Sequence, residues 1–370
     1  MKRDRHSTIV LLPLIAILAL LLILIGCPRQ LERERATTTT TQEEAGAAFP
    51  QTISGLNQPI AIAFAPDRRI FITERIGQVR IFENGRLREE PFATVDVPEL
   101  PGYHETGLLG IALHPNFQAQ PYVYVYHSYS QGGRLFNRVV RFRDNTNRAQ
   151  SSEIIIDRIP GGRIHDGGII LFGPDGNLYV GTGDSGNSEL AQNKSSLAGK
   201  VLRVEPDGSI PPDNPFGNAV FSIGHRNIFG MAFNLTNKAL YITENGPIGN
   251  DEVNKVESGK NYGWPEALGE SDDPRFANPV IVYRTTIAPT QAIFYTGDIF
   301  SQIKDNFVFG TYVTQELHAL ELTSRGLDRV RRDKVVFNSS EPIIGVAQSP
   351  DGAIYITDGN SVRRIDRLEN

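Results

Sequence analysis

One short pattern recurs six times along the chain and constrains its fold more than any other feature. Each copy is a turn built on Pro-Asp or Asn, followed by an alternating apolar strand with Tyr or Phe. The turns lie at residues 65–67, 114–116, 173–176, 234–237, 305–306 and 349–352. Intervals of roughly 45 to 70 residues suit the four-stranded blades of a β-propeller with loops of variable length. The pattern therefore predicts an all-β, six-bladed β-propeller with four-stranded blades over residues 50–370.

A β-sandwich is the alternative all-β architecture, but repeats of this length fit radial repetition better. The 35 glycines and 23 prolines of the 370 residues agree with a chain rich in turns. Helical periodicity is confined to residues 190–202, where Gly199 interrupts it. The loops of a propeller converge at one mouth of its central channel. We therefore expect functional residues to be polar, to lie in loops and to be scattered along the sequence.

The charge balance and the cysteine count exclude several classes of function. The chain carries 37 Lys and Arg against 42 Asp and Glu, a formal net charge of −5, which argues against nucleic acid as a partner. The single cysteine, Cys27, excludes internal disulfides, CxxC redox pairs, iron–sulfur clusters and cysteine-rich zinc sites. Redox chemistry in this chain would therefore depend on a bound organic cofactor.

The first 27 residues resemble a bacterial lipoprotein signal peptide. Residues 1–7 are basic, residues 9–25 are almost wholly apolar, and Gly26 precedes Cys27. Cleavage before Cys27 and acylation of its thiol would leave an exported protein anchored to the cell envelope by lipid; an uncleaved membrane anchor is the alternative. Residues 28–49 have the composition of a flexible tether, so the folded domain should begin near residue 50.

A histidine and an aspartate lie at the ends of neighbouring strands of one predicted blade. His165 precedes the strand at 169–172, and Asp184 follows the next strand. A neutral imidazole can take a proton from a hydroxyl, and a carboxylate on its other nitrogen fixes the tautomer. The pair is a candidate general base with its orienting carboxylate; a histidine held for structural reasons is the alternative. The other six histidines form no HxH or HExxH motif, so a histidine-built metal site has no support.

Two later loops carry further charged and polar groups. Arg226 and Asn227 place a guanidinium beside an amide, either of which can hold an anionic oxygen; an arginine that braces neighbouring loops is the alternative. Carboxylates and glycine turns at 244–252 suit a hard cation such as calcium, although their spacing is not that of an EF-hand. A solvated acidic turn is the alternative there.

Taken in order, these motifs resemble the soluble quinoprotein glucose dehydrogenases and aldose sugar dehydrogenases, also called glucose/sorbosone dehydrogenases. The resemblance spans about residues 51–366 and is carried by His165 and by segments at 107–110, 114–117, 173–176, 183–184, 213–216, 224–227, 244–247 and 261–265. It implies a six-bladed propeller that binds pyrroloquinoline quinone (PQQ) and calcium over the channel. It also implies that the anomeric carbon of an aldose is oxidised to a lactone, with the electrons passing on to a separate acceptor.

The resemblance also implies roles for individual residues. His165 would be the general base, Asp184 would orient it, and Arg226 would face the quinone oxygen on which negative charge develops. Further residues match positions that contact the cofactor, the substrate or calcium. They are Asn227, Asn245, Asp251 and Thr286 near PQQ, Glu105 facing the substrate where a glutamine occurs in the family, Gly246 and Pro247 holding the PQQ-linked calcium through their carbonyls, and Glu252 and Tyr262 at a second calcium site.

The sequence departs from the family at three cationic positions. Val313, Pro342 and Ile344 stand where a lysine and two arginines bind the carboxylates of the cofactor. At about 1.5–3 kcal/mol for each charge-assisted bond, their loss would weaken PQQ binding by roughly three to six orders of magnitude, which Arg284 would offset in part. Two alternatives to a dehydrogenase follow. One is a propeller without cofactor that binds carbohydrate or protein at the cell surface, and the other is a calcium-dependent lactone hydrolase.

Overall fold

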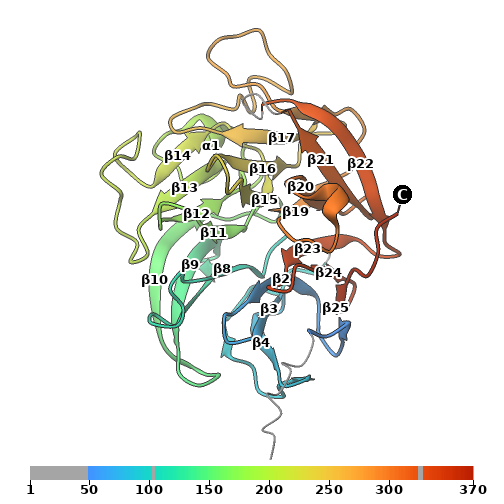
Figure 1. The fold of residues 1–370 in the computed structure, drawn as a ribbon. Helices are drawn as coiled ribbons and strands as arrows, with labels where there is room; N and C mark the ends of the chain where they lie inside the picture. Colours follow the sequence, from blue (N-terminus) through green and yellow to red (C-terminus); the bar gives the residue numbers. More distant parts are fainter. Residues whose placement is uncertain (1–48, 102–104, 324–327, 370) are drawn as a thin grey trace, which may run out of the picture. The chain divides into compact units, whose positions relative to one another are not determined.

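The computed structural model describes residues 49–101, 105–323 and 328–369, in which 25 strands form six antiparallel sheets (Figure 1). The expected signal peptide and all but the last residue of the expected tether lie outside the described residues. Residues 47–370 form one compact unit. None of the described helices has the length and apolar character needed to cross a membrane.

Each of the first three sheets is one blade, and its strands follow one another outward from the centre of the ring (Figure 1). Blade 1 contains β2 (Pro59–Phe64), β3 (Ile70–Glu74), β4 (Gln78–Glu83) and two short strands that both pair with β4, β5 (Arg86–Leu87) and β6 (Ala93–Thr94). Blade 2 contains β7 (Leu108–Leu113), β8 (Tyr122–Gln131), β9 (Arg134–Asp144) and β10 (Ala149–Pro160). Blade 3 contains β11 (Ile170–Phe172), β12 (Leu178–Gly181), β13 (Lys200–Val204) and β14 (Val220–Ile223), with helix α1 (Glu189–Gln192) between β12 and β13.

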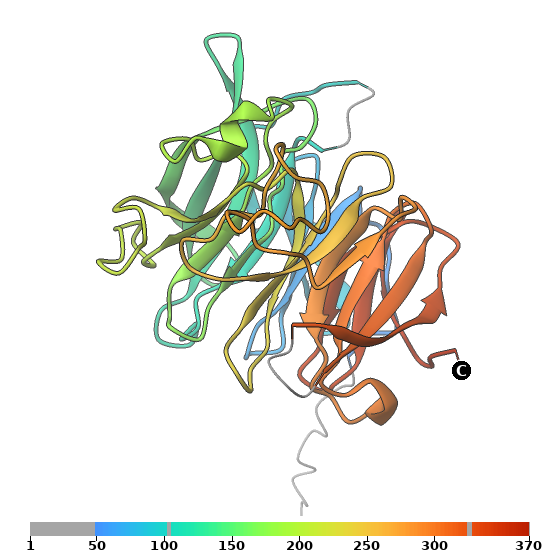
Figure 2. The same cartoon turned by 90° about the horizontal axis from the view of Figure 1, so that it is seen from above.

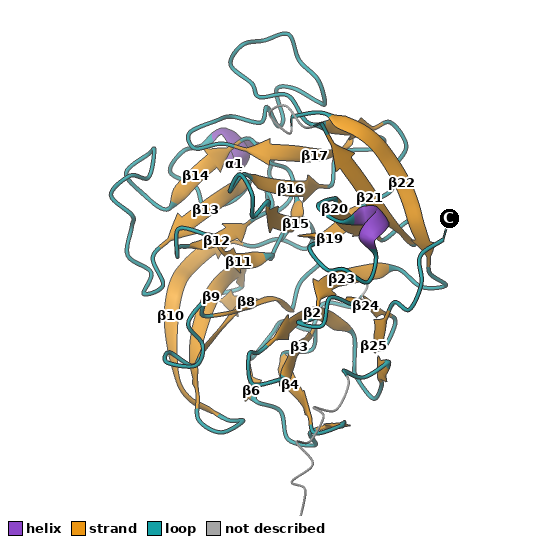
Figure 3. Cartoon of the chain, in the orientation of Figure 1, coloured by secondary structure: helices purple, strands orange, loops and turns teal. Residues whose placement is uncertain are grey.

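The remaining blades repeat this arrangement. Blade 4 contains β15 (Ile228–Phe233), β16 (Leu240–Glu244), β17 (Asp251–Val256) and β18 (Ile281–Tyr283). Blade 5 contains β19 (Pro289–Phe294), β20 (Phe307–Thr311), β21 (Glu316–Leu322) and β22 (Val330–Asn338), with the 3₁₀ turn η1 (Ser301–Ile303) between β19 and β20. Blade 6 contains β23 (Ile343–Gln348), β24 (Ile354–Asp358), β25 (Ser361–Arg364) and, from the other end of the chain, β1 (Thr52–Ile53). Strands dominate the described chain (Figure 3).

The ring is closed by contacts between successive innermost strands and by a shared last blade. Strands β2, β7, β11, β15, β19 and β23 each contact the next, and β23 contacts β2. Strand β1 pairs with β25, with Thr52 opposite Arg363 and Ile53 opposite Val362. A closed ring leaves few free sheet edges, which is how propellers avoid edge-to-edge association. The six-bladed all-β propeller predicted from the repeat is confirmed; only blade 1, with two short outer strands, departs from four strands.

Neighbouring blades approach closely because small and β-branched residues meet at their contacts. A Cβ atom on Gly230 would lie only 2.2 Å from the carbonyl oxygen of Thr290 in the next blade. That same oxygen accepts a hydrogen bond of 2.7 Å from Thr243 Oγ1. Thr73 Oγ1 donates an equivalent bond of 2.7 Å to the carbonyl of Leu109, between blades 1 and 2. These bonds satisfy buried polar groups and fix the angle between blades.

The ring has two faces with different connections. The turns that follow each innermost strand carry the repeated pattern and gather on one face, which we call the lower face. The loops between the second and third strands, and those that lead into the next blade, gather on the upper face. In Figure 2, α1 lies toward the upper face and η1 toward the lower one. Every candidate site residue lies at an upper-face end of a strand or in an upper-face loop except Tyr262, which lies in the excursion between β17 and β18.

Candidate functional site

His165 and Asp184 form the pair that the sequence predicted. His165 Nδ1 lies 2.7 Å from Asp184 Oδ1, and both side chains are almost fully buried. His165 adopts a left-handed backbone conformation, with φ of 60°, and its carbonyl accepts a hydrogen bond from Ser185 N. A non-glycine residue in this region is uncommon. The loop between β10 and β11 is therefore turned sharply so that His165 meets the end of β12.

Trp264 holds the second carboxylate oxygen of Asp184. Its Nε1 donates a hydrogen bond of 2.8 Å to Asp184 Oδ2, while Gly186 N donates 2.8 Å to Oδ1. An ionised carboxylate only accepts hydrogen bonds, so Asp184 is held through both oxygens. Sequence reasoning missed this contact. The signal was present, because Trp264 is the only tryptophan of the chain and lies in one of the segments that carry the resemblance.

Arg226 lies on the other side of Trp264. The guanidinium carbon is 5.4 Å from the centre of the indole ring, and Nη1 donates hydrogen bonds of 2.8 Å to the carbonyls of Asn245 and Gly246. Burial lowers the pKa of Arg226, and nearby carboxylates such as Asp184 oppose that shift. The indole of Trp264 thus contacts both Asp184, which orients His165, and the guanidinium of Arg226.

A buried chain of hydrogen bonds fixes the backbone of Arg226. Glu244 Oε1 accepts a bond of 2.6 Å from Arg226 N, and Glu244 Oε2 lies 2.9 Å from His225 Nδ1. His225 Nε2 is 2.8 Å from Ser222 Oγ, and its ring stacks on Tyr262 with centroids 4.7 Å apart. Ser222 and His225 are fully buried, so this Ser-His-Glu arrangement has no access to substrate. It supports the loop that carries Arg226.

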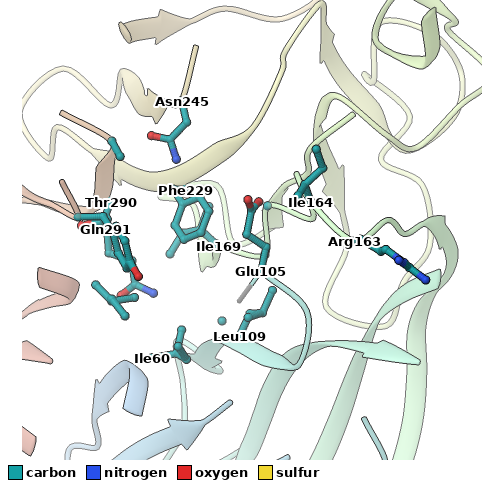
Figure 4. Close-up of a pocket in the computed structure, with 16 residues that line it drawn as sticks. Ile60, Glu105, Leu109, Arg163, Ile164, Ile169, Phe229, Asn245, Thr290 and Gln291 are labelled. Carbon is teal, nitrogen blue, oxygen red and sulfur yellow. The ribbon is translucent and has the colours of Figure 1, made fainter. Parts of the chain in front are cut away.

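A cavity of about 340 Å³ opens beside this cluster at the upper end of the channel, and we call it the channel cavity (Figure 4). It is lined by Ile60, Glu105, Leu109, Gly110, Arg163, Ile164, Gly167, Gly168, Ile169, Phe229, Asn245, Ala288, Thr290, Gln291, Tyr312 and Ile344. His165, Asp184 and Arg226 do not line it, but His165 is bonded to Glu105 and Arg226 to the carbonyl of Asn245, and both of those residues do. Glu105 Oε2 accepts bonds of 2.6 Å from His165 N and 3.0 Å from Asn227 Nδ2.

Asp251 and Thr286, expected near the cofactor, instead shape the loops around the channel cavity. Asp251 is buried and accepts hydrogen bonds of 2.8–3.0 Å from the backbone N–H groups of Gly246, Ile287 and Ala288. Burial raises its pKa, and these three donors oppose the shift. Thr286 Oγ1 accepts a bond of 3.0 Å from Gly249 N. Neither side chain lines the cavity.

The oxygen atoms expected to hold calcium at the mouth are engaged by protein donors. The carbonyl of Gly246 accepts from Arg226, and that of Pro247 accepts from Asn250 N at 3.0 Å. Among the residues that the structure describes, no group of three or more His, Cys, Asp or Glu side chains has the arrangement of a metal site. Calcium bound by these two carbonyls would therefore share them with, or displace, the donors that now bond them.

The second expected calcium position contains two carboxyl groups close together. Asn254 Nδ2 donates to Glu252 Oε2 at 3.1 Å and is 3.4 Å from Glu244 Oε2. Burial, with the nearby Glu244, raises the pKa of Glu252 to about 8. The hydroxyl of Tyr262 is engaged in a bond of 2.7 Å to the carbonyl of Lys255, so it is not a free ligand.

The positions that lack the cations of the family lie at the upper end of the channel. Ile344 lines the channel cavity, and Val313 is 55% exposed next to Tyr312, which also lines it. Arg284 donates to Asn250 Oδ1 at 3.1 Å and lines a separate groove between blades 4 and 5. It does not line the channel cavity and so does not replace the missing cations there.

Comparison with known proteins gives a consistent result. Residues 56–367 match the family model described as Glucose / Sorbosone dehydrogenase. The chain is 32% identical over 357 residues to protein slr1608 of Synechocystis, with 86% of this chain and 85% of that protein covered. It is 33% identical over 261 residues to quinoprotein glucose dehydrogenase B of Acinetobacter calcoaceticus, with 61% of this chain and 54% of that protein covered. The PQQ-bound aldose sugar dehydrogenase of Streptomyces coelicolor superposes with a TM-score of 0.75 at 28% identity, covering 87% of this chain and 98% of that one.

Proposed function

Because the chain belongs to the glucose/sorbosone dehydrogenase family, we propose that it oxidises the anomeric hydroxyl of an aldose to a lactone with a bound quinone as the hydride acceptor, of which PQQ is the one bound by the Streptomyces coelicolor relative. The observation that carries this proposal is the His165–Asp184 pair beside the channel cavity, with Arg226 close to both. In the reaction the aldose loses a hydride from its anomeric carbon and a proton from its hydroxyl. A quinone such as PQQ, held beside Arg226 and Asn245, would supply the acceptor for the hydride and for one proton.

His165 is the group that takes the hydroxyl proton. The carboxylate of Asp184 only accepts hydrogen bonds, so the bond of 2.7 Å places the ring proton on Nδ1 and leaves the lone pair on Nε2. Trp264 Nε1 and Gly186 N hold the carboxylate in place. His165 therefore acts as a general base whose tautomer is fixed before the substrate arrives.

Arg226 supplies fixed positive charge near the reacting groups. Its backbone is held by Glu244 and its guanidinium by two carbonyls and the face of Trp264. A cation held in advance stabilises developing negative charge without reorganising during the reaction. Its position is consistent with a role at the oxygen that gains charge as the hydride leaves the sugar.

The residues at the mouth fit the reacting edge of a quinone. Asn245 Oδ1 is buried and has no hydrogen-bond partner, and Asn245 lines the channel cavity beside the carbonyl that Arg226 binds. An unpaired buried polar atom is costly unless a ligand or water meets it. Because Oδ1 only accepts, it would meet a hydroxyl of the quinol or of the sugar, whereas the guanidinium of Arg226 would donate to a quinone oxygen, with Asn227 beside it.

Calcium would bind at the two positions that the resemblance implies. A cation beside Glu252 would offset the repulsion between this side chain and Glu244. At the mouth, it would compete with the donors that now bond the carbonyls of Gly246 and Pro247. Added calcium should raise the melting temperature and a chelator should lower it, and this comparison needs no active enzyme.

Export and membrane attachment complete the proposed function. The signal-like sequence ending at Cys27 would place a lipid-anchored domain in the cell envelope, where a separate electron acceptor reoxidises the quinol. Growth of cells with labelled palmitate and replacement of Cys27 by serine would test the anchor. Label that persists in the Cys27→Ser variant would contradict it.

The deciding experiment follows quinone reduction by sugars. The protein is mixed with PQQ and an aldose, and quinol absorbance and lactone are measured together with a 1-deuterated aldose for comparison. We expect equal amounts of quinol and lactone and a slower reaction with the deuterated sugar. Sorbitol, which has no anomeric hydroxyl, is the control. The absence of lactone with every aldose, both with PQQ and with an uncharged quinone, would favour the alternative that Val313, Pro342 and Ile344 suggest, a propeller that binds carbohydrate or protein without a cofactor.

A further inference from the structure

The wall of the channel cavity is mainly apolar. Ile60, Leu109, Ile169, Phe229 and Ile344 line it, and they come from strands or strand ends of five different blades. A cavity of about 340 Å³ with such walls suits a flat ring system, since burial of apolar surface supplies most of the binding free energy in sites of this kind.

The charge that faces the cavity is negative. Glu105 and Arg163 are the charged residues among the described residues that line it. In Figure 4 the carboxylate of Glu105 lies between Phe229 and Ile164, whereas the guanidinium of Arg163 points away from the other labelled side chains. A carboxylate in a poorly solvated cavity disfavours an anionic ligand.

Two amides give the cavity its polar contacts. Asn245 Oδ1 is buried without a partner. The side chain of Gln291 is 7% exposed, and its amide points into the cavity (Figure 4). Amides of this kind can meet the oxygens of a quinone or the hydroxyls of a quinol without bringing a net charge.

We propose that the channel cavity selects an uncharged quinone over the tricarboxylate PQQ, through its apolar walls, the amides of Asn245 and Gln291 and the carboxylate of Glu105. The proposal rests on the proposed function only in taking the ligand to be a quinone. The same oxidation still balances, because an uncharged quinone also takes up one hydride and one proton to become a quinol.

The test measures binding to the full-length protein by calorimetry and by quenching of Trp264, whose fluorescence is the only tryptophan signal of the chain. PQQ is compared with 9,10-phenanthrenequinone, an uncharged quinone with three fused rings, and with phenanthrene, which lacks the oxygens. We expect phenanthrenequinone to bind at least tenfold more tightly than PQQ and more tightly than phenanthrene. PQQ binding as tightly as phenanthrenequinone, or no binding of phenanthrenequinone up to its solubility limit, would overturn the proposal.

Two variants restore positive charge at the cavity. Ile344→Arg changes a lining residue, and Val313→Lys changes an exposed residue at the rim, so that at least one variant should fold normally. Each should tighten PQQ binding at least tenfold. Val313→Lys should change phenanthrenequinone binding less than threefold, whereas Ile344→Arg, which removes part of the apolar wall, should weaken it. Unchanged PQQ affinity in a folded variant would contradict the proposal. Adding an aldose separates the two proposals. If phenanthrenequinone binds more tightly than PQQ but no sugar is oxidised, the proposed function is refuted and the proposed quinone site is supported.

Discussion

The two ends of the central channel are built on the same strands and yet differ in chemistry. At the upper end, charged and polar loops surround the channel cavity. At the lower end, a cavity of about 430 Å³ has no charged residue among the described residues that line it. Four innermost strands end there in phenylalanine, at Phe64, Phe172, Phe233 and Phe294. The strands therefore provide a neutral scaffold, and the loops at one end alone provide the reactive groups.

The lower turns are also more regular than the upper loops. The first residue of the turn donates its backbone N–H across the turn to the carbonyl of the residue that closes it. This bond recurs in all six blades, from Ala65 to Arg69, His114 to Tyr122, Gly173 to Asn177, Asn234 to Ala239, Tyr295 to Asn306 and Ser349 to Ala353. The pattern that discloses the fold thus belongs to the end of the channel without the candidate site.

The largest effect should come from removing His165. We expect His165→Ala to lower kcat by about 10³-fold, within the range that general bases contribute, with little change in melting temperature. His114 is the matched control at the lower face, where its Nδ1 accepts a bond of 3.1 Å from Asn116 N. His114→Ala should lower stability and keep kcat. Equal losses of kcat in the two variants would break the distinction between the ends.

The free energy of unfolding should change with pH in opposite directions through an aspartate at each end of the channel, Asp166 at the upper end and Asp351 at the lower end. Burial raises the pKa of Asp166 to about 7, against opposing bonds from Asn137 and Gly162. The folded state therefore holds this proton more tightly than the unfolded state, and stability falls as the pH rises from about 4 to 7, by up to about 4 kcal/mol. Denaturant unfolding of wild type and Asp166→Asn across this range checks the sign, because the variant should lose the slope.

Asp351 at the lower face gives the contrast. Burial raises the pKa of Asp351, but bonds from Ser349 and Arg364 outweigh it and leave the pKa lowered. Its contribution to stability is therefore present above its ordinary pKa and is lost as the pH falls below that value. Asp351→Asn should reduce stability at pH 7 and converge with wild type in acid. A flat difference between the two proteins across this range would be inconsistent with that assignment.

Trp264→Phe should have an intermediate effect. It removes the bond of 2.8 Å to Asp184, and one hydrogen bond to a charged group is worth about 1.5–3 kcal/mol, or roughly 10- to 100-fold in kcat. The control is Tyr295→Phe near the lower face, which removes a bond of 2.7 Å to the carbonyl of Gly352. It should cost about 1 kcal/mol of stability and leave kcat unchanged. The pH profile of kcat should shift in the tryptophan variant alone.

The smallest effect should come from the lower cavity itself. Leu235 lines it and is 67% exposed, so Leu235→Ser should change the free energy of unfolding by no more than about 0.5 kcal/mol and leave sugar oxidation intact. Steady-state kinetics and thermal unfolding check both. A loss of activity without a loss of stability would show that the lower end takes part in the reaction.

The sequence predicted the architecture because the lower turns repeat. A Pro-Asp or Asn turn marks where the chain reverses direction, and the alternating residues after it mark a strand with one apolar face. Six such units are enough to predict the blades. The pairing of His165 with Asp184 was also predictable, because both residues flank strands of one blade. The short α1 (Glu189–Gln192) overlaps only the first three residues of the segment 190–202, where helical periodicity was visible.

Other parts of the site depend on packing between blades and were not predictable from local patterns. Trp264 reaches Asp184 across 80 positions of sequence, from an excursion between two strands of another blade. Asp251 has the residue type of a cofactor ligand, yet three backbone donors from neighbouring loops engage it. Gln291 lies in a strand, and nothing in the local sequence distinguishes it from other polar residues. Its amide lies in the channel because the ring of blades closes around it.

The pairing of β1 with β25 has a mechanical consequence. The chain ahead of β1 is itself held by two inner strands. The ring of Phe49 packs on that of Phe64 at the end of β2, and the carbonyl of Pro50 accepts a hydrogen bond of 2.6 Å from the hydroxyl of Tyr355 in β24. A pull applied to the chain ahead of Phe49 would therefore load the first and last blades together, along with β1. A domain tethered at this end would carry the force on the seam that closes its ring.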